Sequence, residues 1–585
     1  MLKDKNFSKY TLHIIQTKKH AEHYIKNFGK NKNDLVFPIS IDALYTIEKK
    51  NLKFLNFYDL WDTNKESYYK EFYIKKINNF IYDLDSRLVK QSNKFEHIAE
   101  GFRFQLEIIL GNLFFLNQFK KEILSFNFKS IICYESFILS KFIYDFRPNP
   151  RKLIFNIFVN SKNENSIKKI IFFPEFYILK EEIENILKSK LWKYVRRFFK
   201  KSKKFSGVNQ SSYLLLGGEY DWPIYLDNRK ILFSRISRDY KFNIKKNKYL
   251  FIKKILFDLF KKYFSFNYHF YDNFLSELID KISFEMIYII SKKNYCIQLL
   301  NSKKAIITSC VVDPFESYLC LLFKSYGKNV ILWQHGENGF VSERDILNES
   351  SELRVCNKYL AYTENIASVL ENYFDKFLKI PNKPNFYAVG SVHKKPKTFL
   401  NPNLNEKILL CVGKFFGVSR FFQDLGDPDL RLYKIHKSFL KIAKRNCKKY
   451  KFEIKANNTF MFNHLPYDSN NSFNTNYKSR FIDLLNLTRA VILDTPATTL
   501  IEASCTNVPI FAIKGRSEYT NEFYEISSKR VCWCEDNMEL EFKLQEFLNN
   551  GVYDANVEDK SLVESYLGND SYEVIWEKVD KILNS

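Results

Sequence analysis

The sequence lacks the long apolar runs and the leader that mark membrane and secreted proteins. None of its 585 residues falls in an apolar stretch of the ~18 residues that a membrane span requires. The first residues, Met1 to Phe7, are charged and polar, without the apolar core of a secretory signal. We therefore expect a cytoplasmic protein, or one that binds the inner-membrane surface from the cytoplasm.

Cysteine and histidine are too scattered to predict a metal or redox site. The ten cysteines form no C-x-x-C pair, and Cys532-Trp533-Cys534, with one residue between the thiols, suits neither a zinc ribbon nor a thioredoxin motif. The nine histidines are spread along the chain. We expect reduced, buried thiols, no metal site and no resident cofactor.

Arginine is scarce in a chain of strongly positive charge. The formal charge is +25, yet lysines number 73 and arginines only 18. Nucleic-acid binding would favour arginine, whose guanidinium binds phosphate through two hydrogen bonds. The abundance of Lys, Asn, Ile, Phe and Tyr is instead typical of an AT-rich genome, so we expect no nucleic-acid partner.

The common catalytic motifs are also missing. The sequence contains no G-x-x-x-x-G-K-[ST] loop and no clear G-x-G-x-x-G turn. It has neither a G-x-S-x-G elbow nor an H-E-x-x-H helix. These absences argue against four classes of protein: nucleoside triphosphatases, dinucleotide-binding proteins, serine hydrolases and zinc proteases.

Two strand-end motifs carry the strongest positive signal. The apolar run 329–333 leads into Gln334-His335-Gly336-Glu337, and the run 490–493 leads into Asp494-Thr495-Pro496-Ala497-Thr498-Thr499. Short β-branched runs of this kind predict buried parallel strands. Ligands of open α/β sheets lie beyond the carboxyl ends of such strands, so both loops are candidate site loops.

The order of predicted strands and helices divides the chain into an N-terminal region and two Rossmann-like halves. Residues 1–300 form an α/β region with helical insertions, which we assign to the acceptor. Strands near 305–309, 328–333, 358–362 and 385–389 place the first half at 301–398. A polar, proline-punctuated linker near 395–406 precedes the second half at 405–585, whose last 35 residues predict helices folding back over the sheet.

The segment 188–204 concentrates positive charge. Nine lysines and arginines alternate with aromatic residues, and no acid lies between them. This pattern suits an anionic membrane surface, where each basic residue contributes about 1 kcal/mol. An ordinary solvated helix face in a lysine-rich chain explains it equally well, so both interpretations stay open.

Two Rossmann-like halves joined by a short linker define the GT-B architecture, and residues of roughly 300–540 resemble bacterial surface-polysaccharide transferases of that fold. The relatives suggested are the CDP-glycerol glycerophosphotransferases and the capsule and lipopolysaccharide glycosyltransferases. The residues that carry the resemblance are Gln334-His335-Gly336, Gly413-Lys414 and Asp494-Thr495-Pro496-x-Thr498-Thr499-x-x-Glu502. It implies an α/β, GT-B-like fold whose two domains face a cleft, with an α-rich N-terminal elaboration.

On the first half, the resemblance implies a base or substrate-contact role for His335. Its glycine-flanked turn lets a neutral imidazole reach an acceptor hydroxyl, although a histidine that only braces the turn is the alternative. Gln334, Gly336 and Glu337 complete the predicted substrate loop. Two further carboxylates after the strand 305–309 are candidates for base work or acceptor binding, namely Asp313 and Glu316.

On the second half, the predicted site binds the donor. Hydroxyls at a helix start favour phosphate, and an acid further along the helix can hold a sugar or ribose hydroxyl. Cations at strand ends can neutralise the departing phosphate. The predicted donor-binding residues are Gly413, Lys414, Lys455, Asp494, Thr495, Thr498, Thr499 and Glu502.

The sequence departs from some relatives in one place. Where they carry a His-Pro pair after the second strand of this half, the chain reads Lys455-Ala456-Asn457, and His464-Leu465-Pro466 follows later. This weakens the case for a CMP-linked donor. The sequence predicts a metal-independent transferase acting on a nucleotide-activated donor and a growing capsule or lipopolysaccharide glycan on a lipid carrier. The alternatives are a nucleotide-sugar epimerase of the same fold and a non-catalytic protein that binds anionic lipid or nucleic acid.

Overall fold

The computed structural model divides the protein into two compact units. One comprises residues 1–212, 237–302 and 417–422, and the other comprises residues 213–236, 303–416 and 423–585. The structure describes residues 7–56, 60–61, 65–136, 142–144, 147–148, 167–172, 211–216, 221–236, 246–264, 268–336, 344–378, 380–392, 406–413, 429–456, 473–496, 498–515 and 519–585.

The first unit contains a small parallel sheet of order β2-β1-β3-β6. Its strands are β1 (Thr11–Ile15), β2 (Asp34–Pro38), β3 (Ser130–Ser136) and β6 (Ile167–Phe172), with α1 (Lys18–Asn27) after β1 and α2 (Ile41–Lys49) after β2. Apolar side chains of β1 and β2 pack with α1 and α2 in one buried cluster that includes Ile15, Val36 and Ile47. The sheet therefore has a core of its own.

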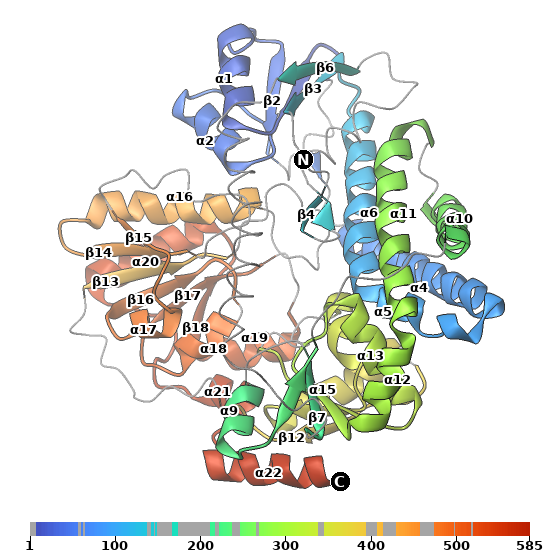
Figure 1. Ribbon diagram of the computed structural model, residues 1–585. Coiled ribbons are helices and arrows are strands. Elements are labelled where there is room, and N and C mark those ends of the chain that lie inside the picture. Colours follow the sequence, from blue (N-terminus) through green and yellow to red (C-terminus); the bar gives the residue numbers. More distant parts are fainter. Residues whose placement is uncertain are drawn as a thin grey trace. The chain divides into compact units, whose positions relative to one another are not determined.

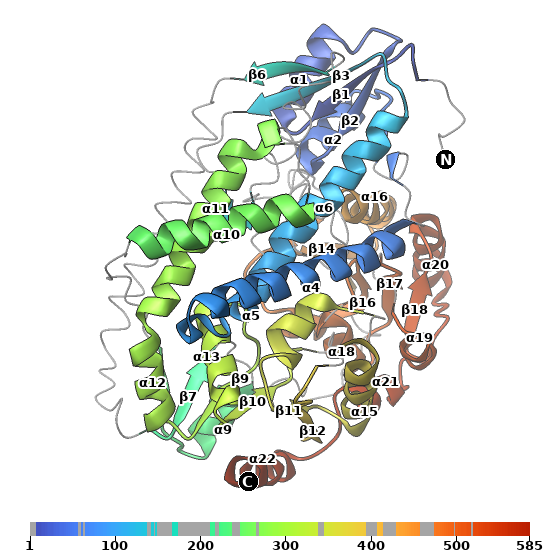
Figure 2. The same ribbon diagram turned by 90° about the vertical axis from the view of Figure 1, so that its right-hand side faces the viewer.

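Long helices form the rest of this unit, as the scarcity of glycine and proline in 65–125 predicts. They are α4 (Glu66–Gln91), α5 (Ile98–Gly101), α6 (Arg103–Ser125), α10 (Lys246–Phe264), α11 (Tyr268–Ser291) and α12 (Lys293–Ser302), with the short pair β4 (Phe142–Tyr144) and β5 (Arg147–Pro148) and a 3₁₀ turn at Asn93–Phe95. Figures 1 and 2 show α4 beside α10, where the Phe80 ring lies 5.3 Å from that of Phe260. No helix in the described parts of the chain is long and apolar enough to cross a bilayer.

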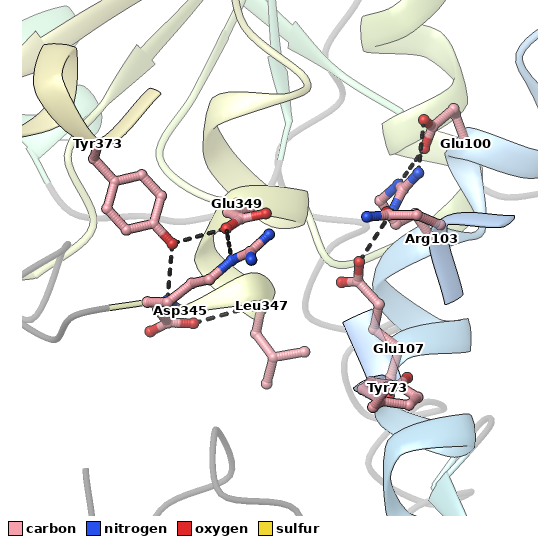
Figure 3. A network of polar contacts seen from close by, with 10 residues as sticks. Tyr73, Glu100, Arg103, Glu107, Asp345, Leu347, Glu349 and Tyr373 are labelled. Atoms are coloured by element: carbon pink, nitrogen blue, oxygen red, sulfur yellow. Dashed lines mark hydrogen bonds and ion pairs between the residues drawn. The ribbon is translucent and has the colours of Figure 1, made fainter. Parts of the chain in front are cut away.

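Arg103, at the start of α6, is almost fully buried and is balanced by two acids of its own helix region. It pairs with Glu100 and, at 3.4 Å, with Glu107 (Figure 3). These carboxylates raise the pKa of the guanidinium despite its burial. A buried charge with such partners avoids most of the desolvation penalty.

The second unit contains two six-stranded parallel sheets, which confirms the predicted fold class of two Rossmann-like halves with an N-terminal elaboration. The first sheet has the order β12-β11-β10-β9-β7-β8. Its strands are β7 (Tyr213–Leu216), β8 (Phe233–Arg235), β9 (Ala305–Thr308), β10 (Asn329–Trp333), β11 (Lys358–Ala361) and β12 (Asn385–Ala388). Its helices are α9 (Asp221–Asn228), α13 (Pro314–Ser325), α14 (Ile346–Asn348) and α15 (Glu364–Tyr373), with π-helical turns at Glu349–Leu353 and Phe374–Leu378.

One boundary differs from the expected domain division. The sequence analysis assigned residues 213–236 to the N-terminal region that ends at 300, whereas β7 and β8 pair with β9 and extend the first sheet of the second unit. The two strands are far from β9 in the sequence, and their pairing with it is a long-range contact that local patterns do not encode.

The second sheet has the order β15-β14-β13-β16-β17-β18. Its strands are β13 (Lys407–Cys411), β14 (Lys451–Lys455), β15 (Asn474–Asn476), β16 (Thr488–Leu493), β17 (Ile510–Ile513) and β18 (Val531–Cys534). Its helices are α16 (Asp429–Asn446), α17 (Phe481–Leu485), α18 (Thr498–Ser504), α19 (Asn521–Ser528) and α20 (Asn537–Asn550). Figure 1 shows α16 on one side of this sheet and α17 to α19 on the other.

The last two helices, α21 (Ser561–Tyr566) and α22 (Tyr572–Asn584), pack on the first sheet of the same unit. Thr363 donates a hydrogen bond to the Ser565 carbonyl at 2.6 Å, and Lys358 donates to the Ile582 carbonyl at 3.2 Å. Figure 1 shows α22 next to α9, where Arg229 pairs with Asp580 at 2.6 Å. The predicted C-terminal helices thus fold back, onto the sheet that begins the unit.

Candidate functional site

The carboxyl edge of the second six-stranded sheet is the best-developed candidate site. The chain runs from β13 to β14 and β15 on one side, then returns to the other side of β13 as β16. The gap between the carboxyl ends of β13 and β16 is therefore a topological switch point, the usual place for ligands in open α/β sheets. Gly413 follows β13 and Asp494 follows β16, so two predicted donor-binding residues flank this gap.

Asp494 connects the two strand ends. Its Oδ1 accepts a hydrogen bond from the Gly413 amide at 2.7 Å, and its Oδ2 lies 2.7 Å from Nε2 of His436 on α16. Asp494 and His436 are both fully buried. A buried carboxylate with two donors at this distance is held in one orientation, so it fixes the Gly413 loop against α16.

Gly413 leaves no room for a side chain. A Cβ atom on this residue would lie 2.5 Å from Oγ1 and 3.1 Å from Cβ of Thr495. Thr495 Oγ1 is itself buried, and no described residue forms a hydrogen bond with it. An unpaired buried hydroxyl costs about 1–3 kcal/mol, which a ligand oxygen at this place would recover.

Four more side chains gather around Cys411 at the end of β13. Burial raises the pKa of the Cys411 thiol well above its usual value; the carboxylates of Asp494 and Glu502 add to this effect, while Lys455 and a hydrogen bond from Thr499 oppose it. Lys455 lies opposite Cys411 in the β13–β14 register. The structure thus places all five side chains at one edge of the sheet.

The ammonium group of Lys455, the cation among these side chains, already forms one hydrogen bond. Lys455 is 7% exposed, its Nζ donates to the Ala456 carbonyl at 3.0 Å, and burial lowers its pKa. Thr498 and Thr499 are half-buried on the first turn of α18, and Glu502 lies one turn further along. Hydroxyls and backbone amides near a buried ammonium suit an anionic group such as a phosphate.

On the first sheet of the unit, Gln334 braces the loop that carries His335. The Gln334 side chain donates to the Gly336 carbonyl at 2.8 Å and accepts from the Tyr362 amide at 2.9 Å. Gly336 has φ of +82°, which glycine adopts without strain. Because both ends of the Gln334 amide are used, this residue positions the loop, and half-exposed His335 lies at its centre.

Asp221, at the start of α9, holds several loops at this edge together. Its carboxylate accepts hydrogen bonds from the Tyr362 hydroxyl at 3.2 Å, the Ser391 hydroxyl at 3.0 Å and the Val392 amide at 2.6 Å. The Tyr362 hydroxyl also lies 3.0 Å from the Gln334 carbonyl. These contacts connect the strand ends of β10, β11 and β12.

The two extra carboxylates predicted after β9 are at the start of α13. Asp313 is the N-cap, and its Oδ1 accepts from the amides of Phe315 at 3.0 Å and Glu316 at 3.2 Å. Burial raises the pKa of two neighbouring thiols, Cys310 and Cys320, and the carboxylate of Glu316 in the first turn adds to this effect. Capping explains Asp313 structurally, and a role in catalysis stays a prediction for both acids.

Some predicted residues lie outside the described part of the chain. They are Glu337 of the substrate loop, Lys414 of the donor site, the linker 395–405 and the basic segment 188–204. Among the described residues, no group of three or more His, Cys, Asp or Glu side chains is arranged to hold a metal ion. The arrangement of the two predicted domains around a cleft stays a prediction.

Two residues of these edges escaped the sequence analysis, namely His436 and Asp221. His436 lies in the middle of a predicted helix, 58 residues before its partner Asp494, and no motif surrounds it. Asp221 comes shortly after the Gly217-Gly218 pair in the sequence, and no recognised motif includes it. The one sequence signal for His436 is that a histidine stands on an otherwise apolar helix face.

Comparison with known proteins gives structural similarity alone. No protein-family model matches the chain, and no curated protein matches it. Among solved structures, it is similar to TarM, at 18% identity and a TM-score of 0.33, over 51% of this chain and 58% of TarM. It is also similar to UGT71G1 of Medicago truncatula, solved with UDP-glucose, at 12% identity and a TM-score of 0.37, over 65% and 99% of the two chains. A glycosyltransferase of Rickettsia africae shows 12% identity and a TM-score of 0.33 over 64% and 98%.

Proposed function

We propose that this protein is a transferase that moves a sugar, or a polyol phosphate, from a nucleotide-activated donor to a growing surface glycan such as capsule or lipopolysaccharide. The observation that carries the proposal is the link between Asp494 and the Gly413 amide across the β13–β16 switch point. It uses the Gly413 amide and fixes this loop at the gap, where the threonine hydroxyls of the β16–α18 connection and the buried ammonium of Lys455 are the groups that can bind a nucleotide phosphate.

In this proposal the donor phosphates lie between Gly413 and the first turn of α18. Thr495, Thr498 and Thr499 supply hydroxyls, and Lys455 supplies positive charge when the phosphate leaves. Glu502 accepts hydrogen bonds from a sugar or ribose hydroxyl. No resident cofactor or metal takes part, so activity should persist in EDTA.

The acceptor side of the proposal rests on His335. Gln334 and Gly336 hold its loop, so the imidazole can take the proton of an acceptor hydroxyl as that oxygen attacks the donor. The transfer is a single displacement. The acceptor oxygen forms a bond to the transferred group, and the nucleotide leaves with the electron pair of the broken bond. One displacement with one base inverts the configuration at the reacting atom, which is the anomeric carbon of a sugar donor or the phosphorus of a polyol-phosphate donor.

Thermal unfolding with a panel of nucleotide sugars and CDP-glycerol tests the donor site. A ligand that binds only the folded protein at 100 times its Kd stabilises it by about 2.7 kcal/mol, so the true donor should raise the melting temperature. Gly413→Ala should remove this increase. A panel in which no nucleotide-activated compound alters the melting temperature would refute the proposal.

Turnover assays separate transfer from the two alternatives. A transferase consumes donor only with an acceptor glycan and loses at least about a hundredfold in rate in His335→Ala. An epimerase converts the nucleotide sugar without acceptor. A non-catalytic lipid-binding protein consumes no donor, and its binding to anionic vesicles is unchanged in His335→Ala.

A further inference from the structure

The small N-terminal sheet has a switch point of its own. The chain runs from β1 to β2 on one side and returns as β3 on the other side of β1. Gln16 follows β1 directly, and Tyr134 lies on β3 next to Cys133, the partner of Ile14 in the register. The gap between the carboxyl ends of β1 and β3 is thus the position at which an open α/β sheet binds its ligand.

Gln16 bridges this gap and leaves one hydrogen-bond acceptor unused. Its Nε2 donates to the Tyr134 carbonyl at 3.1 Å, and its backbone amide donates to Nδ1 of His20 at 3.2 Å. The residue is 2% exposed, and its Oε1 is buried without a hydrogen-bond partner among the residues that the structure describes. Because Oε1 and Nε2 share one carbon atom, the unpaired oxygen lies at the same gap.

The start of α1 cannot serve as a phosphate site. Thr17 Oγ1 accepts from the His20 amide at 3.2 Å, and the Lys18 amide donates to Oδ2 of Asp42 at 2.9 Å. Ser40 donates to the other oxygen of Asp42. A carboxylate from α2 therefore already occupies the place that an anion would take, and it repels a second anion.

Two histidines near this gap, His13 and His23, are shifted towards their neutral form. Burial lowers the pKa of His13 to about 4 in spite of Asp34, and its Nδ1 lies 2.8 Å from the Tyr134 hydroxyl. His20 uses Nδ1 as an acceptor. Burial and Lys26 lower the pKa of His23. Because His13 and His23 are shifted towards the neutral form and the Asp42 carboxylate already lies at the start of α1, the gap suits a neutral ligand that donates a hydrogen bond.

The surroundings favour a sugar over a nucleobase. A base without a matching base pair gains affinity by stacking on an exposed aromatic ring. Among the described residues of 7–56 and 127–136, no large aromatic side chain is exposed, and Tyr134 is fully buried. A sugar needs only hydroxyl donors and acceptors, which Gln16 complements.

We propose that the gap between β1 and β3 is a second binding site, for an uncharged sugar, one hydroxyl of which donates to Oε1 of Gln16. Binding includes a shift of the side chains that now cover this oxygen. The site lies in a different unit from the β13–β16 gap, and its occupancy does not depend on donor transfer. It gives the N-terminal region a recognition role of its own.

Calorimetric titration and saturation-transfer NMR on the full chain test the proposal. The probes are glucose, galactose and N-acetylglucosamine, with inorganic phosphate and adenosine as comparators. We expect one sugar to bind saturably, and Gln16→Met, which keeps the side-chain volume but removes the amide, to bind it about tenfold more weakly. Gly413→Ala and the exposed control Gln91→Met should bind the sugar like the wild type.

Three results would overturn the proposal. The first is an absence of saturable sugar binding up to about 10 mM, and the second is an equal sugar affinity in Gln16→Met. The third is binding of phosphate or adenosine that Gln16→Met alone abolishes. If Gln16→Met does not fold, Gln16→Asn retains the amide but withdraws the oxygen by one bond of about 1.5 Å. This variant must then bind the sugar more weakly, and donor-induced stabilisation must persist in it.

Discussion

Removing the Asp494 carboxylate should destabilise the second sheet of its unit more than any other single change at the candidate site. In Asp494→Ala, the Gly413 amide and Nε2 of His436 lose their common acceptor, and both contacts are 2.7 Å in the native protein. Each buried donor left unpaired costs about 1–3 kcal/mol. Because two donors lose their acceptor, we expect the free energy of unfolding to fall by about 4 kcal/mol.

The isosteric variant Asp494→Asn should lose only part of this stability. Its amide oxygen can accept from one of the two donors, whereas its NH₂ group faces the other, so we expect a loss of about 2 kcal/mol. Asp483→Asn is the matched control, because Asp483 is solvent-exposed and pairs only with Arg480 on the surface. It should behave like the wild type.

Hydrogen exchange followed by mass spectrometry is the appropriate assay, because it reports local opening as well as global unfolding. Peptides that cover β13 and α16 should exchange faster in Asp494→Ala, with Asp494→Asn intermediate. Urea unfolding gives the corresponding free energies. A loss below about 1 kcal/mol in Asp494→Ala, or equal losses in both variants, would refute the reasoning.

Three further changes test other parts of the second unit. Gly413→Ala should abolish donor binding, because the new Cβ would lie 2.5 Å from Thr495 Oγ1. The double variant Gly413→Ala/Thr495→Ala should recover part of the donor binding, as measured by donor-induced stabilisation. Gly390→Ala should lower stability by about 1–3 kcal/mol in thermal unfolding, because its φ is +97° and its Cβ would lie 2.8 Å from Cδ1 of Ile575; Ile575→Val, which lacks that atom, should recover part of the loss. Burial raises the pKa of Glu352 from 4.5 to about 8. The contribution of Glu352 to stability is therefore complete below pH 4.5 and is lost as the pH rises to about 8. Glu352→Gln should flatten that part of the melting-temperature profile, and an unchanged profile would contradict the raised pKa of Glu352.

The buried polar network near Glu352 shows why this acid can be studied separately. Tyr359 donates a hydrogen bond to Glu352 at 2.7 Å. Glu349, in the same π-helical turn, pairs with Arg344 at 3.2 Å and accepts from the Tyr373 hydroxyl at 2.8 Å (Figure 3). Glu349 therefore has a charged partner, whereas Tyr359 offers Glu352 a neutral hydroxyl, so burial dominates the pKa of Glu352.

The sequence by itself determined the strands β9 to β12 of the first six-stranded sheet and β16 of the second, whereas β8, β15 and β18 were not predicted. A buried parallel strand requires a short apolar, β-branched run, and this local pattern is visible without any partner. The run before Asp494 and the run before Gln334 became β16 and β10 almost as predicted. The position of Gly413, Lys455 and Thr499 at one edge then follows from the parallel arrangement.

Only the tertiary structure decided which side chains meet. His436 contacts Asp494 from a helix 58 residues away, β7 and β8 join a sheet whose other strands begin at residue 305, and Gln334 bonds to the Tyr362 amide. Hydrophobic periodicity specifies which face of an element is buried, but not the partner it is buried against, because that choice depends on packing between distant segments. For the same reason, the unpaired oxygen of Gln16 became visible only in the folded chain.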